Sequence, residues 1–318
     1  MRIFHNANYN FIKWRWHALI LSVVIIWAGV ATMFLRGGIP LGIDFTGGTV
    51  VVVRFAQPVG EDAVRTALGP AGADAVVQRF GNDPTKNDIM IRLPLKGTDQ
   101  SNLNEGANRI QQALRAANLG DFTPQRTDLV GPTVGADLQR KGIWATLTAL
   151  GGILIYVAFR FRFTFAVGAI VATFHDILIT LVLLSWFHYE LSLNVIAAIL
   201  TIAGYSVNDT IVVFDRVREN QRAHRRDPLD KIVNDAVNQT LGRTIITSGT
   251  TFLAVISLFI FGGEVLRSFA FTMIVGIVTG TYSTVFIAAS IAIILSRRTP
   301  PTLAAVTKPA DAKRRARA

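Results

Sequence analysis

One acidic residue stands where a membrane-spanning helix would normally be apolar. Asp209 lies within Ile199–Arg216 (ILTIAGYSVNDTIVVFDR), a run that is rich in aliphatic residues. A charge at hydrocarbon depth costs about 2.5–3.5 kcal/mol on insertion scales, and such residues usually serve ion or proton movement. The sequence therefore predicts that Asp209 carries protons, with Asn208 beside it in the pathway.

Three further ionisable residues lie in neighbouring apolar runs. His175 and Asp176 are near the middle of the run before Asp209, and Arg243 opens the run after it. Because Arg243 keeps its charge at any accessible pH, it can attract the Asp209 carboxylate when close and release it when distant. Two simpler interpretations stay open. His175 and Asp176 could only hold helices together through buried hydrogen bonds, and Arg243 could be an interfacial charge.

Polar residues near Asp209 share one side of the expected helix. With ~100° per residue, five of them fall within a narrow arc: Asn194, Thr201, Tyr205, Asn208 and Asp209. Four hydroxyl residues likewise share one side of the following run: Thr244, Thr247, Ser248 and Thr251. We expect the first stripe to face the interior of a helix bundle, where both stripes could form hydrogen bonds between helices.

These residues require a scaffold of membrane-spanning helices. The chain has 318 residues, of which 51% are hydrophobic and only 17% charged, whereas roughly a quarter of residues are charged in soluble domains. Six apolar runs are long enough to cross a ~30 Å hydrocarbon core: 17–35, 142–159, 164–184, 191–214, 244–262 and 270–295. The absence of cysteine excludes disulfides and thiolate metal sites, and we predict neither a metal nor an organic cofactor.

Basic residues predict the orientation of these helices. The segments 1–16, 160–163, 215–243 and 296–318 together hold 19 Lys and Arg against six acids, whereas 36–141 holds 12 against 11. The positive-inside rule places the first four segments, including both termini, in the cytoplasm. The net charge of +11 is then a topology signal, and nucleic-acid binding has little support.

Three segments outside the spans carry further expectations. The first apolar run is longer than the ~7–15 residues of a signal-peptide core, so we expect an uncleaved anchor. Residues 215–243 should be partly helical and lie on the inner membrane surface. The Pro-, Ala- and Arg-rich tail 296–318 should be disordered and close to lipid.

The stretch 36–141 predicts one α+β domain in the periplasm. Its apolar pattern gives the order strand, helix, strand, strand, helix, strand, with these limits: 50–55, 61–68, 75–80, 88–93, 100–117 and 122–130. This βαββαβ order predicts a ferredoxin-like fold with an antiparallel sheet. It contains no His or Cys, so we expect a contact or lever module rather than an enzyme.

Glycine motifs mark the places where the backbone should turn or pack closely. In GIDFTGGT (42–49), Asp44 should order a tight turn that Gly47 and Gly48 permit; a phosphate-binding loop is excluded because a strand follows and no Lys-Ser/Thr is present. Gly276 and Gly280 form a GxxxG pair, which predicts close helix packing.

Three of these segments together resemble the SecF branch of the SecD/SecF family, within the resistance-nodulation-division superfamily: GIDFTGG (42–48), TFHD (173–176) and GYSVNDTIVVFDR (204–216). The resemblance extends over essentially the whole chain up to Arg298. It implies six helices and one large outer domain. It also implies that Asp209 and Arg243 are the family's proton-path residues.

The resemblance further implies an inner-membrane subunit that pairs with SecD and works with SecYEG, SecA and YajC. Such a complex uses the proton gradient to assist the export of unfolded preproteins. Two alternatives remain: half of a small-molecule/proton antiporter, and a scaffold without transport. The first is disfavoured because residues 36–141 contain no Trp or Tyr and only four Phe.

Overall fold

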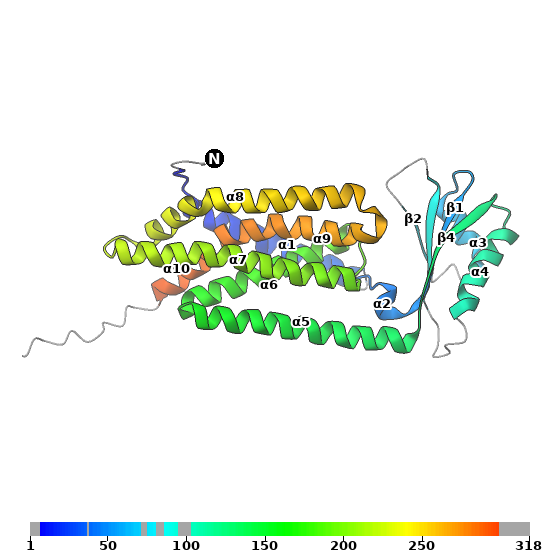
Figure 1. Ribbon diagram of the computed structural model, residues 1–318, viewed down its shortest axis with the longest axis horizontal. Coiled ribbons are helices and arrows are strands. Elements are labelled where there is room, and N and C mark those ends of the chain that lie inside the picture. The colour runs from blue at the N-terminus through cyan, green and yellow to red at the C-terminus, as the bar shows by residue number, and fades with distance from the viewer. Residues whose placement is uncertain (1–6, 37, 71–74, 81–85, 95–102, 299–318) are drawn as a thin grey trace, which may run out of the picture.

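The computed structural model describes residues 7–36, 38–70, 75–80, 86–94 and 103–298. Six long helices form a bundle, and a unit of strands and short helices lies beyond one end of it (Figure 1). That end is the sheet end, and the opposite end, which carries Arg160 and Arg162, is the basic end. The predicted architecture of six spans and one α+β unit is confirmed. The predicted disordered tail lies almost entirely outside the described residues.

The long helices extend beyond the apolar runs that predicted them. A short 3-10 turn, η1 (Ile12–Trp14), leads into the first. The helices are α1 (Arg15–Leu35), α5 (Pro132–Arg160), α6 (Phe163–Trp186), α7 (Leu193–Ala223), α8 (Leu229–Phe261) and the continuous pair α9 (Gly263–Ser283) and α10 (Ala289–Arg298). Hydropathy finds only the part of a helix at hydrocarbon depth, so the polar turns beyond it were not included.

The prediction that residues 215–243 are partly helical is confirmed. Residues 215–223 complete α7 and residues 229–243 begin α8, and the place of this stretch at the inner membrane surface stays a prediction. Its charged residues stay helical because the backbone hydrogen bonds of each helix continue past its apolar part.

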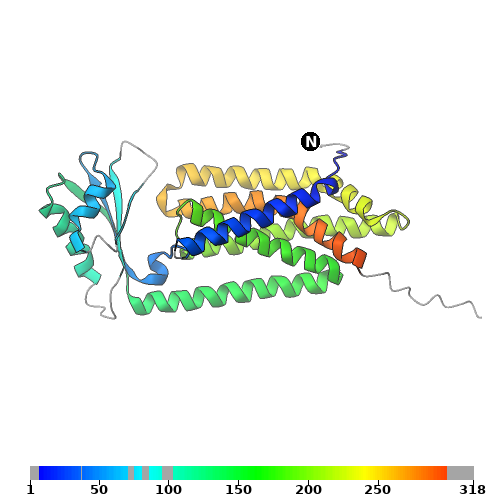
Figure 2. The same ribbon diagram turned by 180° about the vertical axis from the view of Figure 1, so that it is seen from behind.

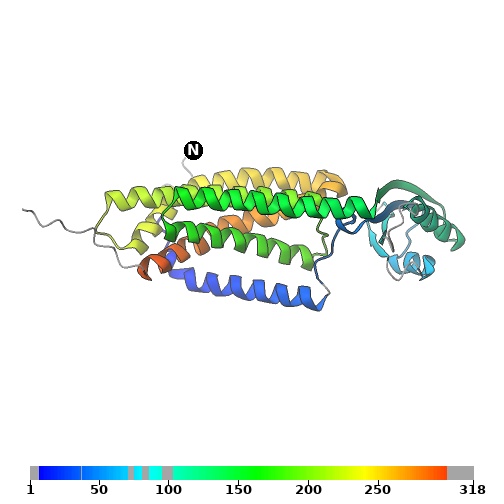
Figure 3. The same ribbon diagram turned by 90° about the horizontal axis from the view of Figure 1, so that it is seen from below.

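Three of the spans form the centre of the bundle. In the most apolar 18-residue stretch of each span, 50–61% of the residues are buried in α6, α7 and the α9–α10 pair. The corresponding share is only 11–17% in α1, α5 and α8. Figure 2 shows α1 running obliquely across the bundle, and Figure 3 shows α5 running directly into the sheet unit. The outer three helices therefore leave much of their surface for lipid or for another protein.

The predicted close-packing face on α9 is confirmed. A Cβ atom at Gly276 would lie 2.2 Å from Cδ1 of Ile202, and one at Gly280 would lie 3.1 Å from Cβ of Ser206. Glycine is thus required at Gly276 for α9 to approach α7 at this distance. A short π-helical segment, η4 (Thr284–Ala288), follows before α10 begins.

We expect the substitution Gly276→Ala to lower the free energy of unfolding by about 1–3 kcal/mol, because the added methyl overpacks the α7–α9 contact. Thermal unfolding in detergent, followed by tryptophan fluorescence, measures the change. Gly152→Ala on α5 is the matched control, since among the described residues no atom beyond its own stretch of helix lies within 4 Å of its Cβ position. Ile202→Ala should lower the free energy of unfolding less in the Gly276→Ala background than in the parent chain, because the two side chains compete for the same space. An equal loss in both backgrounds would contradict the packing explanation.

The unit at the sheet end has the predicted βαββαβ order. Its elements are β1 (Gly48–Phe55), α3 (Glu61–Ala67), β2 (Val76–Arg79), β3 (Asp88–Pro94), α4 (Leu103–Ala116) and β4 (Phe122–Val130). The four strands form one sheet in the order β2-β3-β1-β4, and all neighbours are antiparallel. This is the strand order of a split βαβ fold.

The core of this unit lies between the sheet and the helices α3 and α4. Val51, Phe55 and Ile91 from the sheet pack against Ile110 and Leu114 of α4. β1 is also buried on its other face, through Val50 and Val52. That face turns toward the bundle (Figure 1), where a cavity of about 520 Å³ separates it from the sheet ends of the helices.

The glycine motif builds the connection into the sheet. Residues Ile43–Thr46 form a single helical turn, α2, and Gly47 and Gly48 follow with φ angles of 68° and 141°. These angles favour glycine. A Cβ at Gly135 on α5 would lie 3.0 Å from the Gly47 nitrogen, so α2 also packs closely on α5.

Candidate functional site

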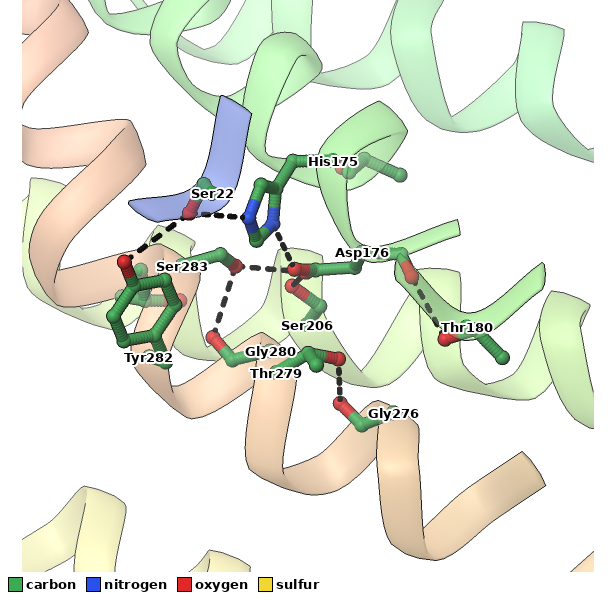
Figure 4. A network of polar contacts seen from close by, with 12 residues as sticks. Ser22, His175, Asp176, Thr180, Ser206, Gly276, Thr279, Gly280, Tyr282 and Ser283 are labelled. Carbon is green, nitrogen blue, oxygen red and sulfur yellow. Dashed lines mark hydrogen bonds and ion pairs between the residues drawn. The ribbon is translucent and has the colours of Figure 1, made fainter. Parts of the chain in front are cut away.

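A fully buried carboxylate joins four segments in the middle of the bundle. Asp176 on α6 is 0% exposed. Its Oδ2 accepts hydrogen bonds from Ser206 of α7 at 2.5 Å and Ser283 of α9 at 2.8 Å. Its Oδ1 lies 3.0 Å from Nδ1 of His175, and Nε2 of His175 lies 2.9 Å from the Ser22 hydroxyl of α1. Figure 4 shows these side chains converging on Asp176.

The network continues from His175 to the backbone of α1. The Tyr282 hydroxyl donates to the Ala18 carbonyl at 2.8 Å and lies 3.1 Å from the Ser22 hydroxyl, which in turn contacts Nε2 of His175. Through these bonds His175 links Asp176 to α1, and Tyr282 of α9 contacts the same part of α1.

Asp209 lies in a different environment, at the contact between α7 and α8. Its side chain is half-buried, and its Oδ1 accepts a hydrogen bond of 2.7 Å from Thr244 of α8. Its Oδ2 is buried without a hydrogen-bond partner among the described residues. A buried acceptor that is left unpaired costs about 1–3 kcal/mol, and more when the group is charged. Protonation of Asp209, or a new hydrogen-bond partner for its Oδ2, would therefore remove this free-energy cost.

Arg243 is near Asp209 but does not pair with it in this conformation. The guanidinium is close enough to attract the carboxylate, yet the side chain is exposed. Within the described chain, no ion pair links the two residues at 4.0 Å or less. Arg243 thus lies near Asp209, as expected, but the two side chains do not form an ion pair in this conformation.

Hydroxyl groups continue the polar contact toward the sheet end. One turn from Asp209, the Tyr205 hydroxyl donates to Ser248 of α8 at 3.3 Å, and Ser248 lies 2.9 Å from the Thr281 hydroxyl of α9. The other hydroxyls of the predicted α8 stripe behave differently, since Thr247 and Thr251 donate to carbonyls of their own helix. Thr244 and Ser248 thus make the interhelical bonds.

The predicted pathway residues fall into two groups. His175 and Asp176 belong to the buried network of α1, α6, α7 and α9, whereas Asp209 faces α8. No hydrogen bond between described residues joins the two groups directly. Both groups nevertheless include a residue of α7: Ser206 bonds to Asp176, and Asp209, three residues further along, bonds to Thr244.

The expected direction of the α7 stripe is wrong for most of its length. Three of its members are exposed rather than turned into the bundle: Asn194, Thr201 and Asn208. Arg243 and Thr247 are exposed on the adjacent helix α8. We call these five residues the exposed polar face. Sequence periodicity shows that polar residues share one side of a helix, but it does not show what that side contacts.

The sheet unit is attached to the bundle at the start of α7. Asp44 Oδ2 accepts a hydrogen bond of 2.9 Å from the Leu193 nitrogen, which is the first residue of α7. Leu41 and Leu191 form a parallel β-bridge next to it. Through this bond Asp44 joins its turn to the first residue of a spanning helix, and it satisfies one of the backbone N–H groups that a helix start leaves unpaired.

A buried ion pair strengthens this attachment. Arg92 of β3 donates to the Leu41 carbonyl at 2.8 Å and pairs with Glu190, in the loop between α6 and α7. Burial lowers the pKa of Arg92 to about 10, because desolvation disfavours the charged form. Breaking such a pair by removing one partner is costly, at about 3–5 kcal/mol.

Sequence reasoning did not identify several of these partners. Ser22 and Tyr282 complete the His175 network, and Arg92 and Glu190 form the attachment. Ser22 is an isolated hydroxyl in an apolar run, which gives no signal of its own. Arg92 stands out more, since it is a charged residue between the apolar residues Ile91 and Leu93.

Comparison with known proteins agrees with this geometry. A family model described as "Protein export membrane protein SecD/SecF, C-terminal" matches residues 109–298, and one described as "SecD/SecF GG Motif" matches residues 34–59. A protein translocase subunit SecF from Rhodothermus marinus is 45% identical over 94% of this chain and 96% of its own length. SecF from Escherichia coli O157:H7 is 39% identical over 91% of this chain and 88% of its own length.

Solved structures show the same architecture. The crystal structure of SecDF, a translocon-associated membrane protein from Thermus thermophilus, matches with a TM-score of 0.82 and 34% identity over 94% of this chain, but over only 40% of the SecDF chain. SecDF in its super-membrane-facing form matches with a TM-score of 0.66 and 36% identity, over 92% of this chain and 39% of that chain. The chain belongs to the SecD/SecF family of protein export membrane proteins.

Proposed function

We propose that this chain is one half of a membrane complex that uses the proton gradient to assist the export of unfolded preproteins. Its partner would be a SecD subunit. Two findings support this pairing: relatives of similar length are named SecF, and the chain spans only about 40% of the SecDF chain that it resembles. SecYEG, SecA and YajC are the further partners that the family resemblance implies.

The observation that carries the proposal is the exposed polar face beside Asp209. If the chain were alone in a membrane, Asn208 would contact hydrocarbon and Arg243 would lie at its cytoplasmic boundary, and exposing such polar groups to lipid is costly. A second helical half would cover this face and supply hydrogen-bond partners. The proton site would then lie at the boundary between the two halves, and neither half would be complete alone.

In the mechanism that we propose, Asp209 takes up a proton from the periplasmic side and becomes neutral. Its attraction to Arg243 is then lost, and the contact between α7 and α8 changes. The sheet unit is bonded to the start of α7 through Asp44, so movement of α7 reaches it directly. One charge crossing 100 mV provides about 2.3 kcal/mol, which is enough to shift such an equilibrium.

The same proposal fixes the orientation in the inner membrane. Both termini and the basic end would lie in the cytoplasm, because they carry the excess of Lys and Arg. The sheet unit, within residues 36–141, would then lie in the periplasm, where its cavity facing the bundle could contact an emerging preprotein. Protons would be the coupling ion, with no organic cofactor.

Co-purification from native membranes tests this proposal. A tagged chain should retain SecD, and the reconstituted complex should take up protons more rapidly when a preprotein is being exported. The chain reconstituted alone is the control and should show no such uptake. Recovery of the chain without SecD, together with unchanged gradient-dependent export after its depletion, would contradict the proposed function.

A further inference from the structure

A cavity of about 300 Å³ lies at the basic end of the bundle, away from the proton site. Residues from the end of α5, the start of α6 and the last part of α7 surround it: Arg160, Phe161, Arg162, Phe165, Phe214, Arg218 and Gln221. Its volume is at the lower end of the range for small-molecule sites, which is roughly 300–1,000 Å³. Three of its seven lining residues are arginines.

The acidic side chains near this cavity already form ion pairs with arginines. Asp215 accepts from Nη2 of Arg160 at 2.6 and 2.7 Å, and Glu219 pairs with Arg216 at 2.6 Å. The side chains of Arg162 and Arg218 are exposed, and neither has a hydrogen bond or ion pair with another described residue. Two positive charges at the cavity are therefore uncompensated.

Aromatic side chains form the floor of the cavity, and two exposed phenylalanines flank it. Phe214 packs edge-on against Phe161 and Phe165, with ring centroids 5.8 and 5.1 Å apart. On either side of the turn, Phe159 and Phe163 are 89% and 79% exposed. In the run Phe159–Phe163 (FRFRF), the phenylalanines at the two ends can therefore enter hydrocarbon while the arginines stay at the level of the headgroups.

We propose that this cavity binds the headgroup of an anionic phospholipid, with Arg162 and Arg218 contacting its phosphate. Arg160 would be held in place by Asp215 and by its stacking on Phe161, where the guanidinium carbon is 5.1 Å from the ring centroid. Arginine suits this task, because its guanidinium can donate two parallel hydrogen bonds to a phosphate. The aromatic floor favours an amphiphile over a free phosphate ion, since it offers apolar contact to the glycerol and the first methylenes.

Binding of short-chain lipids to the purified full-length chain in detergent tests this site. Dihexanoyl phosphatidylglycerol should bind and raise the unfolding temperature, whereas dihexanoyl phosphatidylcholine and inorganic phosphate at the same concentration should have little effect. With ~1 kcal/mol per basic residue, the double variant Arg162→Gln/Arg218→Gln should bind phosphatidylglycerol about 30-fold more weakly. Without lipid its unfolding temperature should equal that of the parent chain, because both side chains are exposed.

Two further double variants provide the controls. Arg225→Gln/Arg226→Gln removes the same charge from the α7–α8 connection, outside the cavity, and should weaken binding less than about threefold. Arg162→Lys/Arg218→Lys keeps the charge but loses the paired hydrogen bonds of the guanidinium, so it should weaken binding, though less than the glutamine pair does. Equal weakening by both glutamine pairs would overturn the site in favour of general surface charge. Equal affinity for inorganic phosphate, or for phosphatidylcholine, would also overturn it.

Discussion

Replacing Asp209 with asparagine is expected to abolish the part of protein export that depends on the proton gradient, while the chain stays folded. Asparagine has nearly the same shape and keeps an oxygen that can accept the hydrogen bond from Thr244. It does not titrate, so it cannot exchange its charge between the two sides of the membrane. We expect at least about 90% of the gradient-dependent increment to disappear, since one charge crossing 100 mV is worth about 2.3 kcal/mol.

The measurement is preprotein transport into vesicles with and without an imposed gradient, using the complete complex. Asp215→Asn is the matched control, because it makes the same chemical change on the same helix, at a half-exposed ion pair with Arg160. This control should keep its response to the gradient. Normal gradient-dependent export by the Asp209→Asn complex would refute the role of Asp209.

Replacing Asp176 with alanine, in contrast, is expected to destabilise the fold. Truncation to alanine leaves His175, Ser206 and Ser283 without their common acceptor in a site that is fully buried. We expect the free energy of unfolding to fall by about 3–5 kcal/mol, as for other buried charges that lose a partner. Thermal unfolding of the purified chain, followed by its five tryptophans, measures the loss.

Asp176→Asn distinguishes a packing role from a proton-carrying role. The amide oxygen can accept from both serines, and the amide nitrogen can donate to Nδ1 of His175 while Nε2 donates to Ser22. All partners remain satisfied, so we expect a stable chain that keeps most of its gradient-dependent export. If the folded variant lost this export, the His175–Asp176 pair would belong to the proton pathway. Because Asp176 is fully buried and both of its oxygens already have partners, we expect the packing role.

Local sequence patterns were sufficient for the individual elements. In α4 the apolar residues Leu103, Ala107, Ile110 and Leu114 recur at helical spacing, which is enough to predict one apolar side. Ala107, Ile110 and Leu114 are buried, and the Leu103 side chain lies outside the described residues. Hydropathy found the six spans but not their polar ends. The glycines at 47, 48 and 276 were identified by type, because positive φ angles and close helix contacts require them.

The contacts between helices could not be predicted from local sequence patterns. Ser22 and His175 are 153 residues apart, and a single serine in an apolar helix does not indicate which neighbour it meets. The stripe that includes Asn208 was recognised, but it faces outward. A polar side of a helix can contact the same chain or another one, and one sequence does not distinguish these cases.

The attachment at the start of α7 has a mechanical consequence. Asp44, the Leu41–Leu191 bridge and the Arg92–Glu190 pair hold the sheet unit at three separate points, and α5 enters it as a fourth connection. Attachment at several separate points restricts the sheet unit from swivelling freely. Rotation or tilt of α7 must therefore appear as displacement of the whole sheet, and the displacement grows with distance from the joint. A spectroscopic label on α4, at the far side of the sheet, would report such a tilt with the greatest amplitude.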